Sequence, residues 1–344
     1  MSDKRYLGNI ITDTPTAPSN NYGSTSAAGV WSLAEAFAYT KAGLWPTAGI
    51  ANPIALTTTA RDSSGYRTRQ IDAFQITTTG NATDFGDSLN TSGSQELCAG
   101  FSDAVKGFEA GGTSSVTIQT MGYSTGSVAT DFGDLTTVKA ETGGYSNSTR
   151  GLIGGQGTDF GGIDYVTMAS AGNAIDFGDF SSANRNNQCH ASGSQVKAIY
   201  AGFQSDKRVT DFLVPQTTGN GTDFATLTNN HQDCFTGGNL TRIIVAGGLS
   251  TYPTDSMEYN SVASSSGWTD FGDLGTNSGQ AMGGSVSSST RMVIAGGTRN
   301  AYVITNEMWY LEIATTGNAV DFGDLTTAKR GHEARNPSSA SVTG

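Results

Sequence analysis

The chain has 344 residues, of which 36% are hydrophobic and 14% charged, so both a charged helical bundle and a disordered acidic chain are excluded. Its net charge of −11 argues against a nucleic-acid partner, because affinity for phosphates comes largely from Lys and Arg. Three cysteines cannot all pair with one another, and no apolar run is long enough to span a bilayer. We therefore expect a soluble protein with no disulfide framework, no nucleic-acid partner and no membrane partner.

The N-terminal segment, residues 1–65, lacks the repeat that organises the rest of the chain. Its polar stretch 11–29 contains Pro and Gly, which predicts an extended chain. A short helix is predicted over residues 32–42, because Ser32 and Glu35 form a capping box. So short a helix is unstable alone in water, and we expect its apolar side chains to dock on another surface. The docking residues are Trp31, Leu33, Phe37 and Trp45.

One tetrapeptide, Asp-Phe-Gly-Asp, recurs through residues 66–344 with starting positions 45 to 51 residues apart. One copy is degraded and reads Asp-Phe-Ala-Thr. This period is close to that of propeller blades and longer than that of ankyrin or tetratricopeptide repeats. The leading pairs of the six signatures are Asp84 and Phe85, Asp131 and Phe132, Asp176 and Phe177, Asp223 and Phe224, Asp270 and Phe271, and Asp321 and Phe322.

Each period contains four short strand patterns separated by turn residues. In the copy that ends at the third signature they cover residues 139–146, 150–155, 163–170 and 174–180. In most periods a Gly doublet ends the second pattern. Four short strands with such a doublet resemble the blade of a kelch β-propeller, and the resemblance covers the chain from about residue 70 to its end.

The two ends of the array complete each other. Residues 69–87 correspond to the second half of a blade and residues 329–344 to the first half. Five continuous blades and this shared blade give six, and sharing removes the exposed sheet edges. We therefore expect an all-β fold: a six-bladed kelch-like β-propeller over residues 66–344, closed by N- and C-terminal strands and preceded by an extended and helical segment.

The repeated signature has a structural and a chemical interpretation. Protein kinases hold magnesium with Asp-Phe-Gly, but recurrence at blade spacing without a phosphate loop excludes that function here. We expect the Phe rings to fill the space between blades while Gly and Asp shape a turn. A calcium site between paired carboxylates is the alternative.

All three cysteines occupy one position of the repeat. A slot that accepts only small side chains explains this best. A metal site formed by Cys189, Cys234 and either His190 or His231 is the alternative, although the spacings match no established zinc pattern. The equivalent positions in chain order are Cys98, Thr142, Cys189, Cys234, Gly283 and His332.

Five basic residues share another position, eight residues further along each repeat. Each could pair with an Asp of the signature and contribute little to stability. Alternatively, the five could form a surface that binds anions or acidic glycans. This possible basic ring comprises Lys106, Arg150, Lys197, Arg242 and Arg291.

The sequence gives little support for catalysis. Kelch-type oxidases need clustered copper ligands, whereas the three histidines of this chain fall in different repeats. Neither a Gly-x-Ser-x-Gly elbow nor a phosphate loop is present. We therefore expect a protein that is not an enzyme and has no catalytic residues, no cofactor and no metal.

Two stretches resemble phage proteins. Residues 29–35 (GVWSLAE) with 42–46 (AGLWP) are similar to a segment that recurs in virion proteins of tailed phages, particularly marine ones. Repeats such as ATTGNAVDFGDL, residues 314–325, resemble structural proteins of cyanophage-like particles. The resemblance implies a virion protein, assembled in the host cytoplasm.

The same resemblance implies a division of labour between the two parts of the chain. Residues 1–65 would anchor the protein to other virion proteins or to further copies of itself as a homo-oligomer. The propeller would face outward and contact a glycan or protein of the host surface, as a tail or fibre adhesin. A capsid-decorating protein and a virion-associated carbohydrate-active enzyme are the alternatives.

Overall fold

The computed structural model describes residues 32, 34, 54–57, 60–89, 97–103, 105–123, 128–157, 161–185, 188–275, 279–331 and 334–335. The chain divides into two compact units, Met1–Asn52 and Pro53–Gly344. The expected docking residues Trp31, Leu33, Phe37 and Trp45, and nearly all of the helix expected over 32–42, lie outside the described residues. In the described part, no helix has the length and apolar character needed to cross a membrane.

The second unit consists of small antiparallel sheets, six with four strands and one with three. We number the four-stranded sheets I to VI. Sheet I contains β6 (Ala99–Ser102), β7 (Lys106–Ala110), β8 (Thr117–Gly122) and β9 (Thr130–Asp134). Sheet II contains β10 (Lys139–Ser146), β11 (Arg150–Gly157), β12 (Gly162–Thr167) and β13 (Ile175–Asp179). Sheet III contains β14 (His190–Ser194), β15 (Lys197–Ala201), β16 (Val209–Leu213) and β17 (Thr222–Thr226).

The remaining sheets follow the same order, except where the ends of the chain meet. Sheet IV contains β18 (Phe235–Gly238), β19 (Arg242–Ala246), β20 (Ser256–Ser261) and β21 (Thr269–Asp273). Sheet V contains β22 (Gly284–Ser287), β23 (Arg291–Thr298), β24 (Ile304–Glu312) and β25 (Val320–Asp324), with the 3-10 turn η1 (Asn300–Tyr302) before β24. Sheet VI runs in the order β27 (Ala334–Arg335), β1 (Ile54–Thr57), β4 (Gln70–Gln75) and β5 (Thr83–Asp87). The three-stranded sheet runs β26 (Lys329–Arg330), β2 (Ala60–Asp62) and β3 (Arg67–Thr68).

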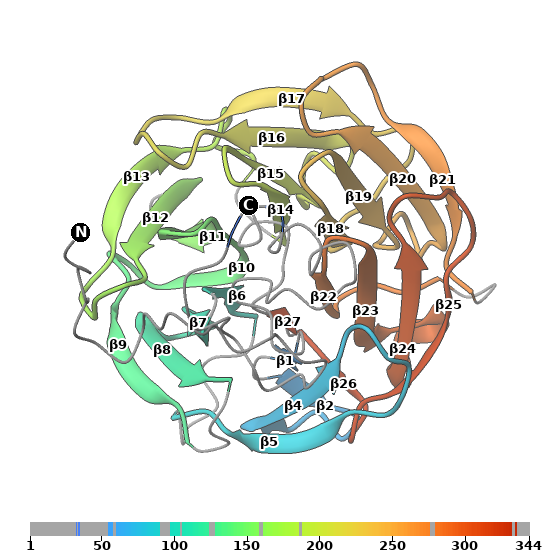
Figure 1. Cartoon of the computed structure of the whole chain (residues 1–344), viewed down its shortest axis with the longest axis horizontal. Coiled ribbons are helices and arrows are strands. Elements are labelled where there is room, and N and C mark those ends of the chain that lie inside the picture. Colours follow the sequence, from blue (N-terminus) through green and yellow to red (C-terminus); the bar gives the residue numbers. More distant parts are fainter. Residues whose placement is uncertain are drawn as a thin grey trace, which may run out of the picture. The chain divides into compact units, whose positions relative to one another are not determined.

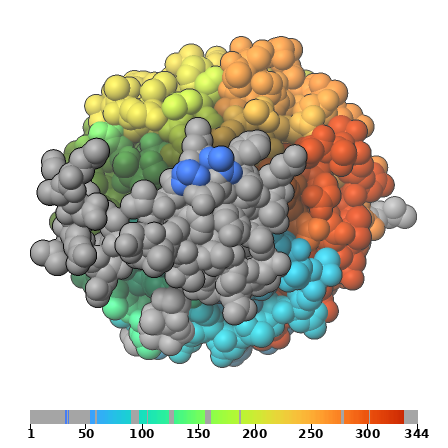
Figure 2. Space-filling model, viewed as in Figure 1, coloured from blue at the N-terminus to red at the C-terminus, as the bar shows by residue number. Residues whose placement is uncertain are grey.

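The six four-stranded sheets are connected through their first strands. In the order β6, β10, β14, β18, β22 and β27, each strand contacts the next, and β27 contacts β6 in turn (Figure 1). The series of contacts therefore closes on itself. Sheets V and VI, which contain the last and first signatures, meet where the Gly80 amide donates to the Phe322 carbonyl over 2.8 Å. Figure 2 shows their red and cyan surfaces side by side.

Sheet VI is closed differently from our expectation. We expected residues 329–344 to supply both inner strands, but β1 from the N-terminal side lies between β27 and β4. The hydrogen-bonded sheet thus begins at Ile54, whereas the sequence placed the boundary at residues 65 and 66. Lys329 and Arg330 pair instead with β2, in the three-stranded sheet. The sequence around β1 lacks the repeat signature, so its place in the array was not recognisable.

Apolar side chains of neighbouring sheets pack together. Phe132 of sheet I lies in one buried cluster with Val166 and Met168 of sheet II, and Phe322 of sheet V lies in another with Phe74 and Ile76 of sheet VI. Burial of this apolar surface is the main attraction that holds one sheet against the next. The hydrophobic core is therefore distributed between the sheets.

Candidate functional site

The signature residues lie in the fourth strand of each sheet, not in a turn as expected. In every copy the Phe is skipped by the strand pairing, so that its two neighbours pair with adjacent residues of the third strand. Such a bulge rotates the extra side chain out of the regular alternation. The Phe ring is thereby placed between sheets, and it is buried in all copies except Phe85, which is partly exposed.

The turn of the next sheet packs directly on this bulge. The amide of Gly172 donates to the carbonyl of Phe132 over 2.9 Å, and the side-chain oxygen of Asn173 accepts from the Asp134 amide over 3.1 Å. The same contacts recur at three further boundaries between sheets. A Gly-Asn turn that precedes the Asp-Phe-Gly-Asp signature therefore encodes both halves of a contact between neighbouring sheets, which gives the repeated spacing a structural role.

Buried polar side chains of the third strands hold the connections between sheets. Asp164 of β12 accepts from the Thr136 amide over 2.8 Å, and Asp211 and Glu258 accept in the same way from Ser181 and Thr228. Asp72 of β4 accepts from the Thr326 hydroxyl over 2.5 Å. Each of these four carboxylates also has a basic partner that the sequence analysis did not identify. The four pairs are Asp164 with Lys139, Asp211 with Arg185, Glu258 with His231 and Asp72 with Lys329.

The basic ring has a structural role different from the expected pairing with signature Asp residues. The guanidinium of Arg150 lies 4.6 Å from the ring centre of Tyr165, and its Nη1 donates to the Pro215 carbonyl of the next sheet over 3.0 Å. Arg242 and Arg291 make equivalent contacts. Lys106 and Lys197 lie over Phe rings. The arginine hydrogen bonds to carbonyls connect adjacent sheets, whereas the two lysines contact rings of their own sheets.

A set of residues that the sequence analysis missed surrounds a pocket where the six sheets meet. Each sheet contributes one residue with a left-handed backbone, at φ between 51° and 68°. Only one other described non-glycine residue, Tyr302, has a positive φ. The six residues, which we call the left-handed ring, are Leu97, Glu141, Gln188, Asp233, Met282 and Gly331. Each stands one position before the shared cysteine position, and this offset is the only sequence signal that could have found them.

Backbone hydrogen bonds connect much of the left-handed ring. The Leu97 amide donates to the Gly331 carbonyl over 2.9 Å, the Gly331 amide to Met282 over 2.7 Å, and the Met282 amide to Asp233 over 3.1 Å. On the other side, the Gln188 amide donates to Glu141 over 3.0 Å. Left-handed backbone is costly for residues other than glycine, and these bonds offset the cost. The pocket is therefore formed by a constrained backbone.

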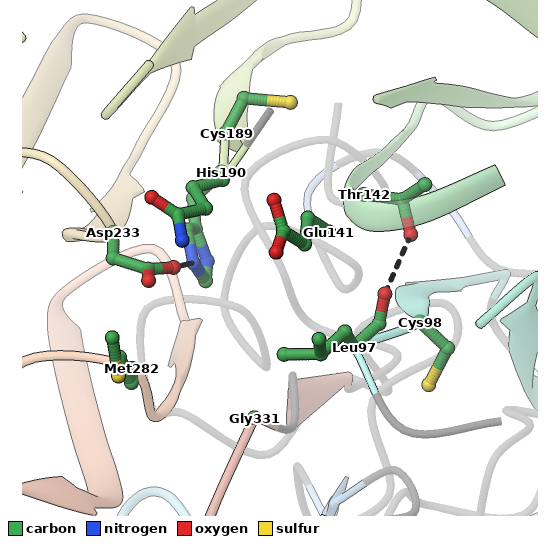
Figure 3. A pocket seen from close by; sticks show the side chains of 10 residues that line it. Leu97, Cys98, Glu141, Thr142, Cys189, His190, Asp233, Met282 and Gly331 are labelled. Atoms are coloured by element: carbon green, nitrogen blue, oxygen red, sulfur yellow. Dashed lines mark hydrogen bonds and ion pairs between the residues drawn. The ribbon is translucent and has the colours of Figure 1, made fainter. Parts of the chain in front are cut away.

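The walls of this pocket differ in polarity. Glu141 projects into it, and Asp233 approaches His190 with 3.7 Å between Oδ1 and Nε2 (Figure 3). Burial and the nearby charge of Asp233 raise the pKa of Glu141. Leu97, Met282 and Gly331 form the apolar part of the lining. The pocket thus offers acceptors for hydrogen bonds on one side and apolar contact on the other.

The cysteines occupy buried positions next to the left-handed ring. Cys98, Cys189 and Cys234 are free thiols, and a side chain on Gly202 would come within 2.8 Å of the Cys234 sulfur. Burial and the charge of Asp233 raise the pKa of the Cys234 thiol, which opposes thiolate formation. Figure 3 shows the Cys98 and Cys189 thiols pointing in different directions. In the described part of the chain no three His, Cys, Asp or Glu side chains are grouped as metal ligands. His332 lies outside the described residues.

No protein-family profile and no curated protein sequence matches this chain.

Proposed function

We propose that the second unit is a six-bladed kelch-like β-propeller and that the whole chain is a non-enzymatic structural protein of a phage particle. In this proposal sheets I to VI are the blades. Residues 1–52 attach the protein to other virion proteins, and the propeller contacts the host surface as a tail or fibre adhesin. The closed succession of first strands and the recurring contacts between sheets support the propeller interpretation.

The division of the chain at Asn52 and Pro53 carries the proposal. Every strand of the described residues belongs to Pro53–Gly344, and the first of them, β1, begins at Ile54. In this proposal the preceding segment serves for attachment. Its similarity to the N-terminal segments of tailed-phage virion proteins supports an assembly role.

The pocket where the six sheets meet, which we call the central pocket, has a volume of about 20 Å³ and can admit a single hydroxyl group of a ligand. Its polar groups, Glu141, Asp233 and His190, can accept or donate hydrogen bonds to such a group, and its backbone is held in place by the hydrogen bonds of the left-handed ring. A constrained surface loses little conformational entropy when it binds, which favours recognition.

Assembly and binding can be tested separately. Particles should incorporate the full chain, while a chain that starts at Pro53 should fold but be absent from them. Purified full chain should bind host cells and retain host polysaccharide without shortening it. Shortened polysaccharide would contradict the non-enzymatic proposal, and normal incorporation of the chain from Pro53 would contradict the anchoring role.

A further inference from the structure

Three tyrosines are the only aromatic side chains that are strongly exposed in the described part of the chain. Tyr66, Tyr252 and Tyr302 are 75%, 61% and 47% exposed. All three lie in connections between the second and third strands, and these belong to three consecutive sheets, IV, V and VI. Single exposed apolar residues are common, but equivalent placement of all exposed aromatic rings indicates a shared surface. We call these three residues the tyrosine rim.

The tyrosine rim is connected to one side of the central pocket. Gln232 pairs with Leu249, three residues before Tyr252, and Ala281 pairs with Thr298, four residues before Tyr302. In sheet VI, Arg330 pairs with Arg61, five residues before Tyr66. Gln232, Ala281 and Arg330 are each followed directly by a residue of the left-handed ring. These three ring residues are Asp233, Met282 and Gly331.

Hydrogen bonds fix the connections that carry the tyrosine rings. The Asp62 carboxylate accepts from the Tyr66 amide over 2.9 Å, and the Asp62 amide donates to the Tyr66 carbonyl over 2.8 Å. The Ser250 amide donates to the Tyr252 carbonyl over 3.1 Å. Tyr302 is held with φ at 57° inside η1. A rigid aromatic ring on an ordered loop gives contact area at low entropic cost.

The charges around the pocket select against an anionic ligand. Glu141 and Asp233 face the pocket, and the chain as a whole carries a net charge of −11. In the connection of sheet V, Arg299 is neutralised by Glu307 at 2.6 Å. Arg69, at the end of the sheet VI connection, donates to the Ser88 carbonyl over 2.9 Å. Arg61, Arg67 and Arg330 also lie in or against the sheet VI connection. The two carboxylates at the pocket and the negative charge of the chain nevertheless oppose an acidic polymer where its hydroxyl groups would be bound.

We propose that the tyrosine rim and the adjoining side of the central pocket bind a neutral polysaccharide. This inference deepens the adhesin proposal and rests on it. Sugar rings present an apolar face, which packs on an aromatic ring, and a hydroxyl edge, which donates to carboxylates. Tyr66, Tyr252 and Tyr302 supply the first kind of contact, and Glu141 and Asp233 supply the second.

The test uses purified full chain and host polysaccharide separated by ion exchange into a neutral and an anionic pool. The chain should bind the neutral pool and not the anionic pool. Tyr252→Ala and Tyr302→Ala should each weaken binding about tenfold, as expected when a well-packed aromatic contact is lost. Tyr252→Phe should retain most of the affinity because it keeps the ring. Val196→Ala, an exposed apolar residue in the β14–β15 turn, is the matched control and should have no effect.

Host-cell binding distinguishes failure of this inference from failure of the adhesin proposal. Cell binding that survives both tyrosine substitutions would overturn the site and leave adhesion standing. Cell binding without affinity for the neutral pool would point to an acidic glycan or a protein receptor and would overturn the ligand class. A chain that binds neither cells nor polysaccharide would overturn the adhesin function and this site with it.

Discussion

Trp309 lies against Gly275, and a β-carbon added to that glycine would come within 2.2 Å of Cζ3 of the indole. Trp309 occupies the third-strand position that holds Asp164 in sheet II and Asp211 in sheet III. Gly275 occupies the position of Thr136 and Ser181, whose amides and hydroxyls donate to those carboxylates. Both positions therefore differ from their counterparts in sheets II and III, and an apolar contact stands in place of a hydrogen-bonded pair.

This replacement predicts a coupled response to mutation. Gly275→Thr should destabilise the protein by about 1–3 kcal/mol, because the new side chain overlaps the indole. Adding Trp309→Asp should recover part of that loss, since it recreates the pair seen at Thr136 and Asp164. Urea unfolding of both single variants and the double variant gives the coupling energy. Losses that simply add would show that the two positions are independent.

The glycine of the signature should resist substitution. Gly323 has φ at 141°, and a β-carbon there would lie 2.6 Å from the Gly80 carbonyl oxygen of sheet VI. Gly323→Ala should cost about 2–4 kcal/mol through backbone strain and separation of the sheets. The degraded copy of the signature offers the control, because Ala225 occupies the position of Gly323 and has no positive φ. There Trp268 packs on the neighbouring Phe224 in place of a TTGN turn. Ala225→Gly should cost no more than about 1 kcal/mol. Equal losses in thermal melts would refute the explanation.

Acid should weaken the contact between Glu258 and His231. Burial alone raises the pKa of Glu258, but hydrogen bonds from His231, Thr228 and Asn229 outweigh it and lower the pKa from 4.5 to about 2. A lowered folded-state pKa means that this stabilisation is fully present above pH 4.5 and is lost as the pH falls toward 2. The shift corresponds to on the order of 3 kcal/mol.

Glu258→Gln should therefore flatten the dependence of the unfolding free energy on pH between about 4.5 and 2. Glu312→Gln is the control, because Glu312 forms an exposed ion pair with Arg291 that contributes little. A wild-type protein whose stability did not fall across this window, relative to Glu258→Gln, would contradict the assigned role.

Much of the sheet structure could be predicted from the repeat. The pattern at residues 139–146 coincides with β10, and that at residues 150–155 falls within β11, because Gly-rich turns and alternating apolar residues mark their ends. The buried pairs of a carboxylate and a basic side chain could not be predicted, since the basic member is Lys, Arg or His in different sheets. The left-handed ring was also missed, because its side chains range from Leu to Glu and share only their backbone conformation.

The shared cysteine position should behave as a small buried slot. The Cys189 thiol donates to the Gly154 carbonyl over 3.3 Å and is fully buried. Cys189→Ala should cost roughly 1 kcal/mol, and Cys189→Leu should cost more because the surrounding backbone leaves no room. Thermal melts with and without a chelator provide the measurement, and we expect the chelator to have no effect. Stoichiometric zinc whose removal lowers the melting temperature would show that the slot is a metal site.

The strand β1 should be indispensable to the second unit, although it precedes the first recognisable repeat. It pairs with β27 on one side and β4 on the other. Its Thr57 hydroxyl accepts from the Asp72 amide over 3.0 Å and from the Lys329 ammonium over 2.9 Å. Burial lowers the pKa of Lys329, and the adjacent Asp72 carboxylate opposes that change. Removal of β1 would leave the edges of β4 and β27 unpaired. It would also remove the Thr57 hydroxyl, which hydrogen-bonds to both members of the buried ion pair between Asp72 and Lys329.

A chain that starts at Pro53 should therefore melt like the full-length protein, whereas one that starts at Gly65 should lose cooperative unfolding or aggregate. Thr57→Val is the finer probe, because it keeps β1 and its shape but removes the hydroxyl between Asp72 and Lys329. It should cost about 1–3 kcal/mol, the usual penalty for leaving buried polar groups without a partner. Thr79→Val, in the turn after β4, changes a hydroxyl at an exposed position and should be nearly neutral. Cooperative melting of the chain from Gly65 at the full-length temperature would mean that sheet VI closes without β1, and the boundary would then lie at residue 65.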